Sequence, residues 1–175
     1  MKKQISSLDL HYLVKELKEL ENSRIDKIYN PEKELLIFSL FKSNEGKRLL
    51  QVNIGQSIFL ADKKETAEEL LGFGQLLRKH IDGYFLVSVE QIKPERIIKL
   101  TFKSKDIIKF LYIEFLGRGN AVLCDAHDVI INALEHHDFR DRSVKPRLKY
   151  AYPISNYNFL FDFETDPSKT MMYLK

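Results

Sequence analysis

Apolar residues recur at helical spacing near the start of the chain. Leucine or valine occupies positions 10, 13, 14, 17 and 20, with lysine and glutamate on the opposite face. This spacing predicts an amphipathic helix over about residues 7–21. Ser6 and Asp9 have the spacing of a capping box, with Asp in place of the usual Glu, so the helix is expected to begin just after Ser6.

The pattern then changes to short apolar and alternating runs, which predict strands. Four precede the middle of the chain, at 24–29, 34–41, 48–53 and 57–61, and five follow it, at 84–92, 95–102, 107–116, 120–125 and 129–135. Asn30-Pro31 and the segment 43–46 are expected to break the first group. Polar turns at 104–106 and 126–128 are expected to join the later strands.

A second helix is predicted between the two groups of strands. Thr66 and Glu69 have the spacing of a capping box, and the secure part of the helix is about 74–82, because two early glycines weaken its first turns. Gly83 can adopt the left-handed conformation that ends a helix.

Nine strands joined mostly by hairpins, together with two helices, predict an α+β domain built on an antiparallel curled sheet or β-sandwich. At 175 residues one domain is the better expectation. We place its boundary at 153. We expect residues 154–175 to be a linker or the truncated start of a following segment.

The composition narrows the class of protein to which the chain can belong. Apolar residues make up 44% and charged residues 30% of the chain, as in folded soluble proteins. No apolar run approaches the roughly 18 residues of a membrane span, and none follows the first lysines, so we expect a cytoplasmic protein. The single cysteine, Cys124, lies in the apolar run AVLCD and is expected to be a buried hydrophobe.

Positive charge is concentrated in one segment. The net charge is +3, but the stretch RDRSVKPRLK, residues 140–149, holds five basic residues and one acid. Such a segment is either a phosphate-binding loop or a solvated surface loop. Its candidate RNA contacts are Arg140, Arg142, Lys145 and Arg147.

The familiar catalytic and cofactor patterns are missing. The run His136-His137-Asp138 is not expected to bind metal, because adjacent residues of an extended chain point to opposite faces. The run LGRGN, residues 116–120, has no phosphate-loop context and predicts a turn with Arg118 at its tip. We predict no catalytic residue, metal or cofactor.

Glu95 and Arg96 stand side by side after Pro94 and open the predicted strand 95–102, so their side chains are expected to project to opposite sides. The charges can guard an edge strand against pairing with another chain. They can also bind RNA, since a guanidinium forks onto phosphate or stacks on a base and a neighbouring carboxylate orients it.

Five segments together resemble the N-terminal domain of the NFACT family, the ribosome quality-control proteins that include NEMF, Caliban and bacterial fibronectin-binding protein A homologues. They are SSLDLHYLVKELKELENSRIDKIYNPEKELLIF, LLRKHIDG, PERIIKLTF, EFLGRGNAVLCD and RDRSVKPRLKYAYP. The match covers about residues 5–153, and LGRGN and RDRS are most similar to the archaeal branch.

The resemblance implies a fold similar to the N-terminal domain of formamidopyrimidine-type DNA glycosylases, without their proline nucleophile, because this chain begins Met1-Lys2-Lys3. It also implies a non-enzymatic partner of the large ribosomal subunit with obstructed peptidyl-tRNA. Such a protein engages tRNA for message-independent tailing of the nascent chain. The family's acidic helix residue and Asp-Arg pair fall on Asp9 and on Glu95-Arg96, with Glu in place of Asp.

Two other functions remain open at this point. A glycosylase-like fold is compatible with a DNA-lesion-binding protein, and a protein-interaction scaffold is the third possibility. The coiled coil and second RNA-associated domain that follow in the family are not visible in the 175 residues. We therefore expect a fragment of a longer protein.

Overall fold

The computed structural model describes residues 5–62, 70–92 and 94–152. Two α-helices, α1 (Ser7–Leu17) and α2 (Gly72–Ile81), accompany a short 3-10 helix, η1 (Lys18–Leu20). The main strands are β1 (Ser23–Glu32), β2 (Leu35–Lys42), β3 (Gly46–Asn53), β4 (Ser57–Ala61), β5 (Phe85–Gln91), β6 (Ile97–Ser104), β7 (Ile107–Glu114), β8 (Asn120–Asp125) and β9 (Ile130–Ala133).

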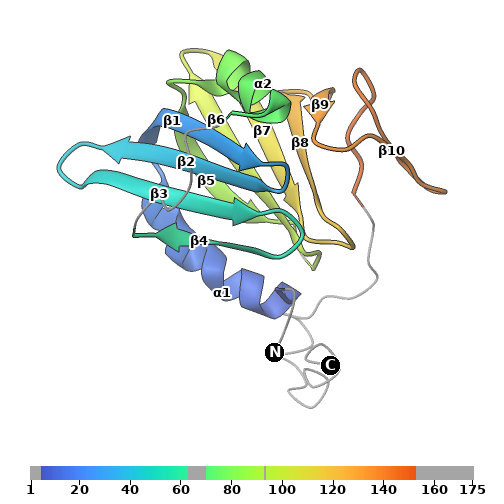
Figure 1. The fold of residues 1–175 in the computed structure, drawn as a ribbon, viewed down its shortest axis with the longest axis horizontal. Helices are drawn as coiled ribbons and strands as arrows, with labels where there is room; N and C mark the ends of the chain where they lie inside the picture. The colour runs from blue at the N-terminus through green and yellow to red at the C-terminus, as the bar shows by residue number, and fades with distance from the viewer. Residues whose placement is uncertain (1–4, 63–69, 93, 153–175) are drawn as a thin grey trace.

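These nine strands form one sheet in the order β4-β3-β2-β1-β5-β6-β7-β8-β9, and all neighbours in it are antiparallel. The predicted antiparallel α+β architecture is confirmed. Figure 1 shows the strands β1–β4 in front of β5–β9, with α2 above and α1 below. The described residues contain no helix long and apolar enough to cross a membrane.

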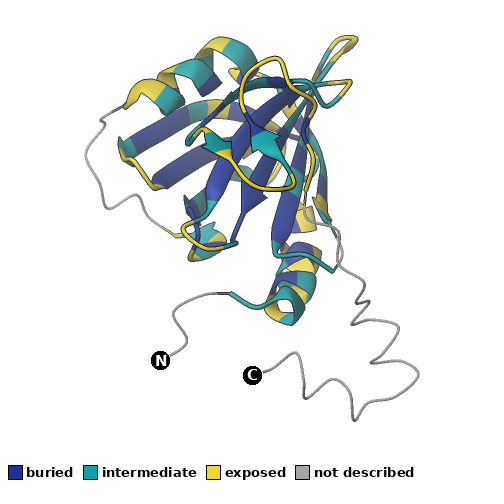
Figure 2. Cartoon of the chain, turned by 90° about the vertical axis from the view of Figure 1, so that its right-hand side faces the viewer, coloured by how far each residue is buried: buried dark blue, intermediate teal, exposed yellow. Residues whose placement is uncertain are grey.

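The sheet turns on itself where β1 meets β5. These two strands pair over only two positions, Ser23 with Leu86 and Arg24 with Phe85. The two halves of the sheet then face each other across the core, where the rings of Phe38 in β2 and Phe102 in β6 stack with centroids 6.3 Å apart. Buried positions gather on the strands and exposed ones in the loops (Figure 2).

Helix α1 follows its sequence prediction closely. The capping box of Ser6 and Asp9 is present, and Leu10, Val14 and Leu17 are buried against the sheet. The first turn is therefore fixed by hydrogen bonds and the rest of the helix by its apolar face. This sets the position of the helix N-terminus against the ends of the strands.

The region around Asn30 differs from the prediction. Strand β1 continues through Asn30 and Pro31 to Glu32, with an irregular register, and is not broken there. The buried Asn30 amide donates to the carbonyls of Glu32 (2.6 Å) and Leu35 (2.9 Å), and its oxygen accepts from the amide of Gly74 (3.0 Å). A side chain replaces the hydrogen bonds that a regular strand would make.

That contact also explains an unfavourable glycine in α2. A Cβ atom on Gly74 would lie 2.5 Å from the Cβ of Asn30, so only glycine permits the approach. Helix α2 begins two residues before its predicted secure part, and Gly83 after it has a φ of +72°, as expected. The predicted capping box of Thr66 and Glu69 lies outside the described residues.

The last described strands and the single cysteine complete the fold. A small ribbon pairs β10 (His137–Asp138) with β11 (Ser143–Val144), and β11 lies in the segment 140–149 that was predicted to be a loop. Cys124 is fully buried in β8, as predicted, and its burial raises the pKa of the thiol to about 12. A protonated, inaccessible thiol is a packing residue.

Candidate nucleic-acid interface

The N-terminus of α1 presents Asp9 at the surface. Its carboxylate accepts a hydrogen bond from the backbone amide of Ser6 (3.0 Å), while the hydroxyl of Ser6 accepts from the amide of Asp9 (3.1 Å). The residue remains exposed. The cap therefore fixes the position of a carboxylate at one end of the domain.

The turn between β5 and β6 is fastened to this helix. The side-chain amide of Gln91 donates 3.0 Å hydrogen bonds to the carbonyl of Ser7, to its hydroxyl and to the carbonyl of Glu95. The hydroxyl of Ser7 in turn donates to the carbonyl of Pro94. Asp9 and the pair Glu95-Arg96, far apart in the sequence, are thus carried by two segments that touch.

The position of Glu95 and Arg96 corrects the sequence analysis. Both residues lie in the turn, and β6 begins only at Ile97, so the alternation of a strand does not separate their side chains. Strand β6 lies inside the sheet between β5 and β7. The interpretation as an edge-strand guard is wrong, because this strand has no edge to guard.

The carboxyl group of Glu95 is perturbed. Partial burial raises its pKa above the ordinary value, and the charge of Arg96 offsets part of that effect. A carboxylate that is costly to ionise, beside a partly buried guanidinium, is typical of a functional site more than of a solvated surface.

The LGRGN turn joins β7 to β8 next to the same end of the sheet. The carbonyl of Arg96 accepts a hydrogen bond from the amide of Phe115 (2.8 Å), the residue just before the turn. A Cβ on Gly119 would lie 2.2 Å from the backbone nitrogen of Gly55 in the β3–β4 turn, so the two turns pack backbone to backbone. Arg118 is exposed at the tip, as predicted.

The last residues of the basic segment 140–149 pair with the start of β9. The amide of Arg147 donates to the carbonyl of Ile130, and the amide of Ile130 donates to the carbonyl of Leu148, each at 2.8 Å. The predicted residues Arg140, Lys145 and Arg147 are all exposed, although the ammonium of Lys145 pairs with Asp138. The backbone is held in place while these cations face solvent.

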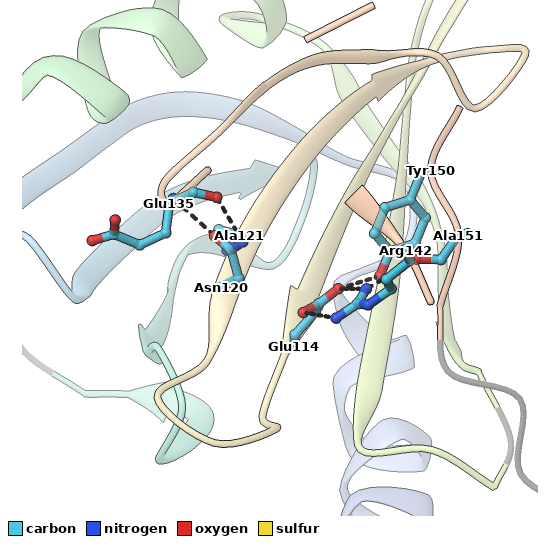
Figure 3. A network of polar contacts seen from close by, with 7 residues as sticks. All are labelled: Glu114, Asn120, Ala121, Glu135, Arg142, Tyr150 and Ala151. Atoms are coloured by element: carbon cyan, nitrogen blue, oxygen red, sulfur yellow. Dashed lines mark hydrogen bonds and ion pairs between the residues drawn. The ribbon is translucent and has the colours of Figure 1, made fainter. Parts of the chain in front are cut away.

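Arg142 is placed differently from its neighbours. Its guanidinium donates to both carboxylate oxygens of Glu114, at 2.7 and 3.0 Å, and to the carbonyl of Ala151 at 2.9 Å (Figure 3). The hydroxyl of Tyr150 donates to the same carboxylate at 2.7 Å. The side chain of Arg142 is only 7% exposed, so the structure gives it a structural role, and direct contact with RNA stays a prediction.

The direction of the pKa shift of Arg142 agrees with a structural role. Burial by itself would lower the pKa of Arg142, but the hydrogen bonds and charge of Glu114 outweigh it and raise the pKa. The sequence analysis missed Glu114 and Tyr150. The available signal was a lone carboxylate inside the apolar run LYIEFL, since a charge in a buried strand needs a partner.

Eight predicted residues can now be placed. Asp9, Glu95 and Arg96 lie on two touching segments, and Arg118 is carried by the adjoining β7–β8 turn. Arg142 joins the basic segment to the end of β7 through Glu114, and Arg147 is held at Ile130, the first residue of β9. Arg140 lies between β10 and β11, and Lys145 directly follows β11. No group of three metal-ligating side chains is found in the part of the chain that the structure describes.

Comparison with known proteins identifies the family of this chain. The family model described as NFACT N-terminal and middle domains matches residues 6–170, and the chain belongs to this family. It is 29% identical over 92% of its length to the archaeal Rqc2 homologue aRqcH of Methanocaldococcus jannaschii, and covers 26% of that protein. It is 34% identical over 65% of its length to the Rqc2 homologue RqcH of Bacillus subtilis, covering 22% of it.

A human relative and a solved structure extend the comparison. The ribosome quality control complex subunit NEMF of Homo sapiens is 29% identical over 89% of the chain, which covers 15% of that protein. The crystal structure of the N-terminal domain of fibronectin-binding protein PavA from Streptococcus pneumoniae has a TM-score of 0.79 at 27% identity. That match covers 93% of this chain and 73% of the other. The chain thus spans about a quarter or less of these full-length relatives.

Proposed function

We propose that this domain is a non-enzymatic RNA-binding module of a ribosome-associated quality-control factor, acting in the cytoplasm. In this proposal it binds the large ribosomal subunit carrying obstructed peptidyl-tRNA. There it engages a tRNA for message-independent tailing of the nascent chain. Membership of the NFACT family and relatives named as ribosome quality control subunits support the role.

The observation that carries the proposal is the convergence at the N-terminus of α1. Two segments some 85 residues apart meet there and carry three charged residues: Arg96 beside Glu95 in the turn, and Asp9 on the adjoining helix. A guanidinium beside a carboxylate is suited to base edges and phosphates, because the acid can orient it and accept from base amines. Exposed arginines on the neighbouring turn and segment supply phosphate contacts.

Binding of tRNA to Arg96→Ala tests the site. Loss of an arginine that contacts a base or phosphate should weaken binding by about 5- to 150-fold, corresponding to roughly 1–3 kcal/mol. Arg24→Ala is the matched control, since Arg24 is exposed at the opposite end of β5 from the turn. Equal affinities of the two variants would remove Arg96 from the site.

The salt dependence of binding tests the basic segment. Neutralising three cations that contact phosphate should reduce the slope of log affinity against log salt by about 2 to 3. The test variant combines Arg140→Gln, Lys145→Gln and Arg147→Gln. The control combines Arg24→Gln, Lys103→Gln and Lys105→Gln, three exposed cations on or next to β1 and β6, outside the basic segment. The same slope in both triple variants would make residues 140–149 an ordinary loop.

The resemblance also implies a glycosylase-like fold, and we propose that this domain shares that fold but not the glycosylase activity. We propose that the domain binds nucleic acid without removing a base. An oxidised-purine duplex incubated with the protein should therefore release no base and form no trapped imine. Release of a base would replace the proposal with a DNA-lesion function, and a complete lack of RNA affinity would favour a protein-interaction scaffold.

A further inference from the structure

A pocket of about 370 Å³ lies between the LGRGN turn and the β10–β11 ribbon. Its lining includes Leu116, Arg118, Phe139, Asp141 and Arg142. This volume is at the lower end of the range for small-ligand sites. The pocket therefore has room for a group of the size of a single nucleotide and is bordered by Arg118, an exposed cation that the proposed function places at the RNA.

Phe139 is the unusual residue of this pocket. Phe139 is 46% exposed, lies in the turn between β10 and β11, and belongs to no buried cluster. Isolated exposed apolar residues are common on protein surfaces and need no explanation by themselves. What distinguishes Phe139 is the way in which its ring is supported.

The support comes from Arg142. The guanidinium carbon of Arg142 lies 4.9 Å from the centroid of the Phe139 ring, and the ring of His137 packs beside it at 5.2 Å. Arg142 is itself locked by two hydrogen bonds to Glu114. The buried ion pair thus holds an exposed aromatic ring in one orientation, which lowers the entropic cost of stacking a ligand on it.

The charges around the ring fit a nucleotide. Arg118 lines the pocket and Arg140 is next to Phe139 in the chain, and within the described residues neither has an ion-pair partner. Both are placed to neutralise phosphates. The exposed carboxylate of Asp141 adds an acceptor for the amino group of a base. An aromatic platform with cations at its border is the usual means of holding an unstacked base.

We propose that this pocket binds one unpaired nucleobase of the RNA by stacking on Phe139, with Arg142 as a positioning residue behind the ring. The inference rests on the proposed RNA-binding function and assigns to it a preference for single-stranded loops. A perfectly paired duplex keeps its bases stacked inside the helix and cannot fill the pocket.

The test compares two RNAs that carry the same phosphates. One is a stem-loop, and the other is the same stem-loop with abasic sites in place of its loop nucleotides. The wild-type chain should prefer the intact loop by roughly 5- to 150-fold, the effect of stacking one base. Phe139→Leu should lose this preference without losing affinity for the abasic RNA. Phe85→Leu is the control, because Phe85 is 47% exposed at the far end of β5.

A fluorescent variant gives an independent signal. The chain contains no tryptophan, so Phe139→Trp introduces a single indole at the proposed platform. Its emission should be quenched by the intact loop and not by the abasic one. If Phe139→Leu keeps the wild-type preference, or the indole is not quenched, the pocket inference is overturned while RNA binding stands. If the wild type binds neither RNA, the proposed function fails and the inference with it.

Discussion

The buried ion pair between Glu114 and Arg142 allows the most direct test of the structure. Arg142→Met removes the guanidinium, keeps much of the apolar stem, and leaves the Glu114 carboxylate with the Tyr150 hydroxyl as its donor. The two side chains are only 4% and 7% exposed, so water cannot replace the lost hydrogen bonds. We expect a loss of about 3–5 kcal/mol in the free energy of unfolding.

Urea unfolding measures this loss. The expected change corresponds to a fall in Tm of roughly 6–20 °C for a chain of this size. Lys47→Met is the matched control, because it breaks an ion pair with Asp26 in which the lysine side chain is 64% exposed. Exposed pairs of this kind contribute less than about 1 kcal/mol. The double variant Glu114→Leu/Arg142→Met should recover much of the loss, since it leaves no unpaired buried charge.

Hydrogen exchange adds a local measurement. The amide of Tyr150 donates to the carbonyl of Asp128 at 2.7 Å and reports whether the basic segment stays docked on the sheet. Arg142→Met should reduce the protection of this amide. The reasoning is refuted if Arg142→Met costs no more than Lys47→Met and leaves the protection unchanged. A double variant as unstable as the sum of both single variants would also refute it.

Three further predictions concern the ends of the strands. Burial raises the pKa of Glu95, so ionisation of this carboxyl group opposes folding. The free energy of unfolding should therefore fall as the pH rises from about 4.5 through the raised pKa. Glu95→Gln should abolish this dependence in thermal melts and raise Tm at pH 7. In urea unfolding, Gly117→Ala should lower the free energy of unfolding by roughly 1 kcal/mol, and Gly119→Ala should lower it clearly more. Both glycines have positive φ, but only a Cβ at position 119 would meet backbone atoms. Equal losses would contradict the packing of the two turns. Ser6→Ala and Asp9→Ala should each destabilise the domain by about 0.5–2 kcal/mol, and only Asp9→Ala should also weaken tRNA binding; equal binding losses would reduce Asp9 to a helix cap.

Local patterns were sufficient for much of the fold. The apolar spacing near the start of the chain predicted α1, and the short apolar and alternating runs predicted nine strands. Strands β1–β9 are present within one or two residues of most predicted ends. The largest error was at Asn30-Pro31, because proline and asparagine normally stop a strand. Here the buried side chain of Asn30 supplies hydrogen bonds that the strand pattern lacks, and no local rule predicts a partner as distant as Gly74.

The candidate site was predicted less completely. The sequence pointed to Glu95 and Arg96 but offered two interpretations, and the edge-strand interpretation was excluded only by the place of β6 inside the sheet. Among five cations of one basic segment, nothing in the sequence distinguished Arg142 from the others. Its partner, Glu114, lies 28 positions earlier, and pairing across such a distance depends on how β7 and the segment pack.

The sequence by itself therefore determined the kinds of elements, the capped start of the first helix, the buried cysteine and the family. These properties depend on the period of apolar residues and on hydrogen bonds between close neighbours, which are encoded within a few positions. Only the tertiary structure decided which charges are exposed and which are buried, and that Asp9 lies on a helix fastened to the turn of Glu95 and Arg96. Burial and pairing depend on contacts between distant segments, and those contacts exist only after the two halves of the sheet have closed around their core.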